Sequence, residues 1–204
     1  MVMFYALVVL ALSGSTMADI IGWGACPDVQ TMPDFDITKT AGTWYAAKMY
    51  FKLDMVFVKC VKAEISQGAN GTMLLDGYGT SRMTGKAGVI HGIELKTLNA
   101  SDPGKIEIKF PFKNWVSQGW VLGTDYDSFF VGYRCIDLKL VNLKRLTIVT
   151  RDQHPSEAVI AKAIEVIKKQ NLNPKFLLPA SQEGCGSTEN STRIQSAEEV
   201  KSFY

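Results

Sequence analysis

The sequence predicts an all-β domain, an antiparallel barrel or sandwich, followed by a single α-helix. Short segments rich in β-branched and aromatic residues recur about every ten residues, separated by Gly, Asn, Asp and Pro, which is typical of antiparallel β-structure. Residues 105–110 alternate strictly between polar and apolar, so Ile106, Ile108 and Phe110 share one face. After residue 151 the apolar spacing changes to that of a helix.

The chain begins with a segment that we expect to be a secretory signal peptide. Phe4 to Leu12 is an unbroken apolar run, and small residues follow as far as Ala18, although no Lys or Arg precedes the run. The run is shorter than the roughly 20 residues of a membrane-spanning helix, which disfavours a retained anchor. We therefore expect residues 1–18 to be removed, residues 19–185 to form one domain, and the mature protein to be secreted and extracellular.

Eight strands are predicted after the signal peptide. They cover residues 43–51, 56–66, 72–81, 88–97, 105–110, 118–124, 128–135 and 145–151. Turn-forming residues at 68–71, 99–104 and 125–127 indicate hairpin connections.

A helix is predicted behind the strands, with one apolar stripe that packs on them. Pro155 marks its start and residues 171–174 its end. Glu157 in the first turn and lysines at 168 and 169 in the last agree with the helix dipole. The stripe follows the i, i+3, i+4, i+7 spacing at Ile160, Ala163, Ile164 and Ile167. Residues 186–204 are polar without periodicity, and we expect a flexible tail there.

The charge pattern gives no sign of a nucleic-acid partner or a membrane-surface stripe. The chain has 22 Lys and Arg against 20 Asp and Glu, a net charge of +2, and no basic block. No transmembrane segment is predicted beyond the signal peptide. The two histidines, His91 and His154, are isolated, so we expect no metal site.

The four cysteines, Cys26, Cys60, Cys135 and Cys185, predict two disulfides. Their number is even, and the signal peptide places them in an oxidising compartment where disulfides persist. Four cysteines allow three pairings, and the sequence alone does not choose among them.

Three spaced motifs give the chain a family resemblance: Gly42-Thr43-Trp44-Tyr45, Thr124-Asp125-Tyr126 and Arg151. With the Cys26-Pro27-Asp28-Val29 opening, they resemble the lipocalin family, and within it the branch of apolipoprotein D, insecticyanin and bilin-binding protein. The resemblance covers residues 26–185. It implies a closed, eight-stranded, up-and-down antiparallel barrel with the helix outside, and the disulfides Cys26–Cys135 and Cys60–Cys185.

The resemblance also assigns the motif residues a structural role. It implies that Trp44 plugs the closed end of the barrel and that Arg151 lies across its ring, an interaction of about 2 kcal/mol when desolvated. Asp125 is expected to accept backbone N–H groups and lock the turn. The structural set is Gly42, Trp44, Thr124, Asp125, Tyr126 and Arg151.

An eight-stranded barrel is wide enough to hold one small ligand, or to be filled by its own side chains. If Arg151 points inward, the two-residue period turns Val149 and Thr147 inward and leaves Leu146 and Ile148 for the helix. The same parity, carried by the resemblance, nominates Ala63, Ile65, Met73, Leu75, Ile90, Ile108, Phe110, Val121 and Phe130 as lining residues. The candidate mouth residues are Met55, Phe57, Phe112 and Trp115.

The resemblance therefore implies a secreted carrier of a small hydrophobic ligand such as a bilin, retinoid, carotenoid, steroid or fatty acid. We expect no required cofactor, although a bound chromophore such as biliverdin is compatible with the cavity. The sequence leaves open a homo-oligomer or a cell-surface receptor as partners. Sequons at Asn70, Asn99 and Asn190 are compatible with glycosylation of a secreted protein.

Two alternatives remain at this point. A lipocalin-type enzyme would need a free cysteine in the pocket, but every cysteine matches a bridging position, and neither His91 nor the pair Asp34 and Asp36 forms a catalytic set. A filled barrel whose mouth loops bind another macromolecule is the second alternative. We expect a binding protein and not an enzyme.

Overall fold

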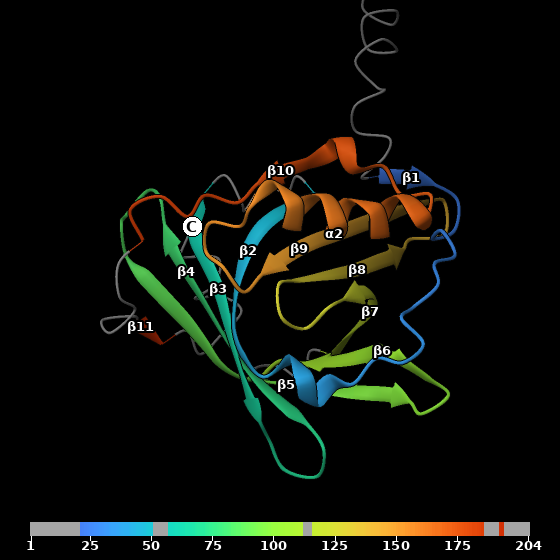
Figure 1. Ribbon diagram of the computed structural model, residues 1–204, viewed down its shortest axis with the longest axis horizontal. Coiled ribbons are helices and arrows are strands. Elements are labelled where there is room, and N and C mark those ends of the chain that lie inside the picture. Colours follow the sequence, from blue (N-terminus) through green and yellow to red (C-terminus); the bar gives the residue numbers. More distant parts are fainter. Residues whose placement is uncertain (1–20, 51–56, 112–115, 186–191, 194–204) are drawn as a thin grey trace, which may run out of the picture.

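The computed structural model describes residues 21–50, 57–111, 116–185 and 192–193, and its centre is a closed antiparallel barrel (Figure 1). Each barrel strand pairs with the next along the chain, and β9 also pairs with β2, where Thr150 lies opposite Tyr45. The predicted eight-stranded barrel is confirmed, and the sandwich alternative is wrong. The strands are β2 (Gly42–Tyr50), β3 (Val58–Gln67), β4 (Met73–Ser81), β5 (Ala87–Asn99), β6 (Asp102–Lys109), β7 (Val116–Thr124), β8 (Phe129–Asp137) and β9 (Val141–Thr150).

Two strands begin clearly earlier than predicted: β9 starts at Val141 instead of 145, and β6 begins inside the predicted turn at 99–104. Asn99 pairs with Asp102, so the turn between β5 and β6 is shorter than predicted. Pro103 and Gly104 suggested a turn, but Gly104 serves a close approach instead. A Cβ atom there would lie 2.6 Å from the Cβ atom of Thr31, so the missing side chain lets the N-terminal segment cross this strand.

A bulge in β5 changes which of its side chains face inward. Gly92 has φ +72°, and the β4–β5 register shifts between Leu75 and Gly77. Asp76 stabilises the bulge by accepting a hydrogen bond from the Gly92 N–H at 2.9 Å. Before the bulge, the even-numbered residue Ile90 faces inward. After it, the odd-numbered residues Ile93 and Leu95 face inward.

Helix α2 (Glu157–Lys169) packs against the outside of β7 and β8, as predicted (Figure 1). Ser156 caps its first turn by accepting a hydrogen bond from the Val159 N–H. Leu146 and Ile148 face the helix, as the two-residue period requires. The buried cluster between helix and barrel contains Tyr50, Leu122, Phe129, Val131, Tyr133, Leu146, Ile148, Ile160, Ala163, Ile167, Leu172 and Leu177.

The N-terminal segment runs from one end of the barrel to the other. Strand β1 (Ile21–Trp23) pairs with β9, and the 3-10 helix η1 (Ile37–Thr40) lies at the opposite end (Figure 1). Between them the Met32 N–H donates to the Val121 carbonyl at 2.8 Å. The sequence predicted none of these elements, because they are short and their apolar residues follow no periodicity.

The C-terminal segment adds strands to the outside of the barrel. After the 3-10 helix η3 (Pro174–Phe176), β10 (Leu177–Pro179) pairs with β2. Strand β11 (Thr192–Arg193) pairs in parallel with β5 at Gly88 and Val89. The rest of the predicted tail, and the predicted signal peptide, lie outside the described residues.

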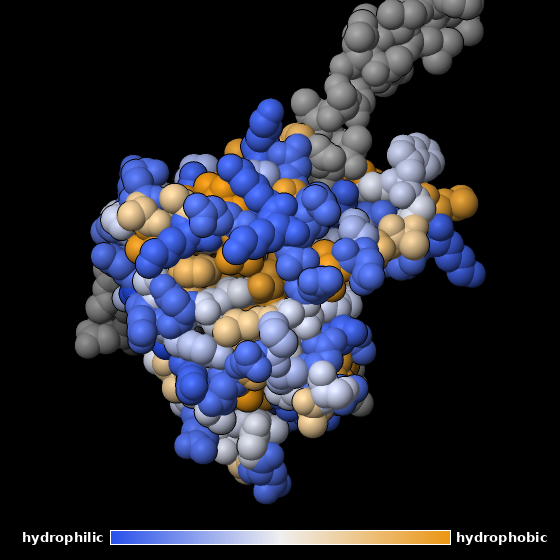
Figure 2. All heavy atoms as spheres, turned by 45° about the vertical axis from the view of Figure 1, so that its right-hand side comes forward, coloured by the Kyte–Doolittle hydropathy of each residue, from blue (hydrophilic) through white to orange (hydrophobic). Residues whose placement is uncertain are grey.

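The outer surface is mostly hydrophilic on the face that Figure 2 shows, with smaller apolar groups between charged and polar side chains. In the part of the chain that the structure describes, no helix combines the length and the apolar character that crossing a membrane would require.

Candidate functional site

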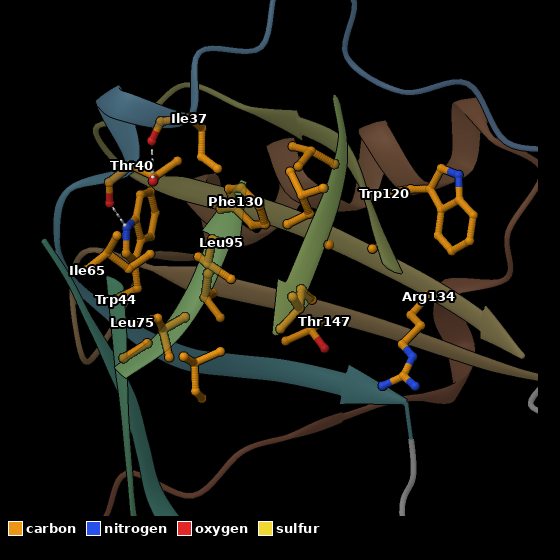
Figure 3. Close-up of a pocket in the computed structure, with 18 of the residues that line it drawn as sticks. Ile37, Thr40, Trp44, Ile65, Leu75, Leu95, Trp120, Phe130, Arg134 and Thr147 are labelled. Carbon is orange, nitrogen blue, oxygen red and sulfur yellow. Dashed lines mark hydrogen bonds between the residues drawn. The ribbon is translucent and has the colours of Figure 1, made fainter. Parts of the chain in front are cut away.

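A cavity of about 380 Å³ occupies the inside of the barrel (Figure 3). Its volume falls in the range of ligand pockets, roughly 300–1,000 Å³. The barrel is therefore hollow and not filled by its own side chains. The cavity is lined by Phe35, Ile37, Thr40, Trp44, Ala63, Ile65, Leu75, Ile93, Leu95, Ile106, Ile108, Phe110, Gly119, Trp120, Val121, Phe130, Gly132, Tyr133, Arg134, Arg145, Thr147 and Val149.

Trp44 forms the floor of this cavity. Its side chain is only 2% exposed, and its indole N–H donates to the Thr40 carbonyl at 2.7 Å (Figure 3). The ring of Phe130 meets the indole edge-on at 6.0 Å, and Phe35 meets Phe130 in the same way at 6.1 Å. Phe35 comes from the N-terminal segment, so that segment supplies part of the floor.

Arg151 lies over the indole ring of Trp44. Its guanidinium carbon lies 3.8 Å from the indole centroid, and it donates to the carbonyls of Tyr126 at 3.0 Å and Thr43 at 3.1 Å. Burial lowers the pKa of Arg151. Gly42 completes the arrangement, because its φ is +103° and a Cβ atom there would lie 2.8 Å from the Nη1 atom of Arg151.

The Thr124-Asp125-Tyr126 turn lies at the same end and is held by its own side chains. The Thr124 hydroxyl donates to the Phe129 carbonyl at 2.6 Å. One Asp125 oxygen accepts the N–H groups of Ser128 at 2.8 Å and Phe129 at 3.0 Å, and the other accepts the Ser128 hydroxyl. Burial raises the pKa of Asp125, but the hydrogen bonds outweigh it, so the net pKa lies below its usual value.

Replacing Asp125 with asparagine is expected to destabilise the protein at neutral pH but not in strong acid. Because the folded pKa of Asp125 lies below its unfolded value of about 3.9, its ionised form stabilises the fold above that pH. The contribution is lost as the pH falls through the folded pKa. Melting temperatures of both proteins from pH 7 downwards should therefore converge below pH ~4. A constant difference over the whole range would contradict this role.

Nine of the nominated residues line the cavity, and three others do not. Met73 is buried in the apolar cluster that contains Phe35 and Ile37, and Ile90 packs against the same cluster before the β5 bulge. Phe57 is not among the lining residues, and its carbonyl accepts a hydrogen bond from the Arg82 N–H at 2.7 Å. The nine are Ala63, Ile65, Leu75, Ile108, Phe110, Val121, Phe130, Thr147 and Val149. Met55, Phe112 and Trp115 lie outside the described residues.

Several lining residues were missed from the sequence. Phe35, Ile37 and Thr40 come from the unpredicted N-terminal segment, whereas Ile93 and Leu95 follow the β5 bulge. The polar residues Arg134 and Arg145 also line the cavity. Both lie on positions that the strand period from Phe130 and Thr147 would have reached.

His91 belongs to a polar network outside the cavity lining. Its Nδ1 atom lies 2.7 Å from Asp76, and its ring meets Tyr78 edge-on. The Tyr78 hydroxyl donates to Glu64 at 3.1 Å, and burial together with this bond raises the pKa of Tyr78 to about 12. Within residues 21–50, 57–111 and 116–185, no three potential ligand side chains gather into a metal site.

The other sequence candidates are distributed over the surface and the turns. Asp36 caps η1 by accepting the Thr38 N–H at 3.0 Å, and Asp34 is exposed. Asn70 is exposed in a turn, Asn99 is exposed at the end of β5, and Asn190 lies outside the described residues.

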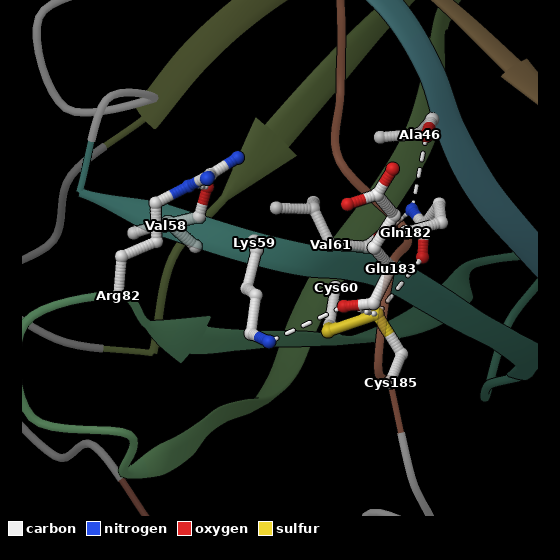
Figure 4. The surroundings of a disulfide bond; sticks show 9 residues. All are labelled: Ala46, Val58, Lys59, Cys60, Val61, Arg82, Gln182, Glu183 and Cys185. Carbon is white, nitrogen blue, oxygen red and sulfur yellow. Dashed lines mark hydrogen bonds between the residues drawn. A yellow bond between two sulfur atoms is a disulfide. The ribbon is translucent and has the colours of Figure 1, made fainter.

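Two disulfides join the terminal segments to the barrel, in the pairing that the resemblance implies: Cys26–Cys135 and Cys60–Cys185. Beside the second bond, the Gln182 side chain inserts between two strands and donates to the carbonyls of Ala46 at 3.0 Å and Val61 at 2.9 Å (Figure 4). Both carbonyls lie next to register shifts in the sheet. Gln182 therefore satisfies acceptors that the irregular ladder leaves open.

Comparison with known proteins agrees with this geometry. A family model described as Lipocalin / cytosolic fatty-acid binding protein family matches residues 41–178. Apolipoprotein D of Macaca fascicularis is 27% identical over 192 residues, covering 88% of this chain and 98% of the relative. Insecticyanin-B of Manduca sexta is 28% identical over 137 residues, 65% of each chain.

Solved structures show the same architecture. Lobster apocrustacyanin A1 superposes with a TM-score of 0.68 at 20% identity, covering 83% of this chain and 93% of the other. Insecticyanin of the tobacco hornworm Manduca sexta gives a TM-score of 0.68 at 20% identity, covering 87% and 96%. The structural match supports the fold, and the family model covers well over half of the sequence. The chain therefore belongs to the lipocalin family.

Proposed function

We propose that the protein is a secreted carrier that binds one small hydrophobic molecule inside its barrel. Lipocalins bind small hydrophobic ligands as carriers. The single observation that carries the proposal is the apolar cavity of about 380 Å³ above the Trp44 floor. A ligand that buries about 400 Å² of apolar surface there would gain about 10 kcal/mol before the costs of association are subtracted.

The proposed secretion is supported by the apolar leader and by the disulfides. Residues 4–12 fit the hydrophobic part of a signal peptide. Both disulfides connect segments more than a hundred residues apart, and such bonds persist in oxidising compartments. Exposed sequons at Asn70 and Asn99 are compatible with glycosylation along the same route.

The carrier function is favoured over the two alternatives by specific observations. All four cysteines form disulfides, so an isomerase that acts through a free thiol would lack its nucleophile. A filled interaction module would lack the cavity that the structure contains. The range of ligands proposed from the cavity includes bilins, retinoids, carotenoids, steroids and fatty acids, bound as cargo and not as a cofactor of a reaction.

An apolar fluorescent probe tests the proposal directly. We expect the protein to take up such a probe and to release it when retinol, a fatty acid or biliverdin is added. Thr147→Trp should abolish uptake, because an inward indole on β9 would fill the cavity. Lys144→Trp on the opposite face of the same strand is the matched control and should leave uptake unchanged. A folded protein without uptake would overturn the carrier function.

A further inference from the structure

Two arginines point into the upper part of the cavity from neighbouring strands. Arg134 on β8 lies directly opposite Arg145 on β9 in the strand register. Gly132 and Phe130 share the inward face of β8 with Arg134, and Thr147 shares that of β9 with Arg145. Arg134 lies at the end of the lining far from Trp44 (Figure 3). Its side chain is half-buried, whereas that of Arg145 is exposed at the rim.

This pair is electrostatically unfavourable as it stands. Like charges directly opposite each other on one face of a sheet destabilise it. Burial, followed by the charge of Arg145, lowers the pKa of Arg134. Neither guanidinium forms an ion pair with a carboxylate among the described residues.

On the outer face of the same barrel, by contrast, several lysines form ion pairs with carboxylates. Three lysines on β3, β5 and β6 have a carboxylate within 2.7–3.2 Å, in the pairs Lys62–Glu64, Lys96–Glu107 and Lys109–Glu94. Lys96 and Lys109 are paired in this way although about half of each side chain is exposed to solvent, which screens such pairs. The two arginines that face the cavity have no carboxylate partner among the described residues. An ion pair would stabilise them more than it stabilises the surface lysines, because charges attract more strongly where less water screens them.

We propose that Arg134 and Arg145 form an anion subsite at the mouth of the cavity and that the natural ligand is an amphipathic carboxylate. The inference rests on the proposed carrier function. A guanidinium presents a planar fork of N–H donors that matches a carboxylate. The ligand carboxylate lies between the two arginines, and its apolar body extends past Thr147 towards Phe130 and the Trp44 floor.

The subsite selects within the ligand classes of the proposed function. A fatty acid, a retinoic-type acid and a bilin with propionate groups all supply the carboxylate. Retinol, sterols and hydrocarbon carotenoids do not. A linear acid and a tetrapyrrole both supply a carboxylate, and comparing each acid with its own ester separates the two.

Matched acids and esters test the subsite. The fluorescent polyene cis-parinaric acid is compared with its methyl ester, and biliverdin with its dimethyl ester, by titration of the purified full-length mature protein. We expect one of the acids to bind about tenfold or more tighter than its ester, because hydrogen bonds between charged groups exceed neutral ones. The pair with the larger ratio identifies the source of the carboxylate.

Arg134→Gln combined with Arg145→Gln should reduce the affinity for the acid to that of the ester and leave ester binding unchanged. Lys144→Gln removes one positive charge from the other face of β9 and should leave the acid binding tighter than the ester. It shows whether the loss of a positive charge outside the cavity affects this preference. The melting temperature of the ligand-free double variant should not fall, because a repulsive pair is removed.

Equal binding of acid and ester by the unmodified protein would overturn the subsite while leaving the carrier function intact. Parallel loss of acid and ester in the double variant would also overturn it, because the arginines would then shape the cavity and not select charge. Absence of binding for every acid and ester would overturn the subsite, and the carrier function falls with it only if the apolar fluorescent probe is not taken up either.

Discussion

Replacing Trp44 with alanine is expected to lower the free energy of unfolding by about 3–5 kcal/mol, the range for large aromatic truncations in cores. The side chain is 2% exposed, fills the floor between Phe130 and Arg151, and makes a hydrogen bond to Thr40. Its removal leaves a void and removes the aromatic partner of the half-buried Arg151 guanidinium. Urea denaturation followed by far-ultraviolet circular dichroism measures the loss.

A double-mutant cycle with Arg151→Ala separates the two contributions. We expect a coupling of about 0.5–2 kcal/mol between Trp44 and Arg151, which is the scale of a cation–π contact. Trp44→Phe is the matched control, since it keeps an aromatic face and should cost less. Arg151→Ala should lower the melting temperature while the affinity for an apolar probe changes little. A large loss of affinity at unchanged melting temperature would contradict the structural role.

Removal of the Cys60–Cys185 disulfide is expected to destabilise the protein by about 4–5 kcal/mol, from the loop entropy released in the unfolded chain. The bond spans 125 residues of sequence, and Cys26–Cys135 spans 109. Cys60→Ser with Cys185→Ser removes the bond without leaving a free thiol. Urea unfolding of this variant against the unmodified protein gives the difference.

The two disulfides also serve as controls for each other. Loss of Cys60–Cys185 should expose the β10 segment and Gln182 to hydrogen exchange, whereas loss of Cys26–Cys135 should act on the N-terminal segment. A loss below 1 kcal/mol for both variants would contradict the entropic account. It would indicate that segment contacts alone hold the termini in place.

The regular parts of the barrel were predictable because their side chains alternate. The eight strands, the helix and the inward parity of Thr147 and Val149 all follow from local periodicity, which burial on one face imposes. Extending the same period by two steps from Phe130 reaches Arg134, and by one step from Thr147 reaches Arg145. They were overlooked because an apolar lining was expected, although the alternation that placed their neighbours applied equally to them.

Features that depend on contacts between distant segments were not predictable. The bulge at Gly92 reverses the parity of β5, and its carboxylate partner, Asp76, lies on the preceding strand. Phe35 reaches the floor only because the N-terminal segment crosses the barrel end. Neither arrangement leaves a periodic signal, since each is decided by tertiary packing.

The main apolar core of this protein lies outside the barrel wall, between β7 to β9 and α2. On β9, the residues of this core, Leu146 and Ile148, alternate with Thr147 and Val149, which face the cavity. Exchanging an inward side chain alters the shape offered to a guest without opening the helix-covered layer. New specificities can accordingly arise by single substitutions that leave the layer between helix and barrel unchanged.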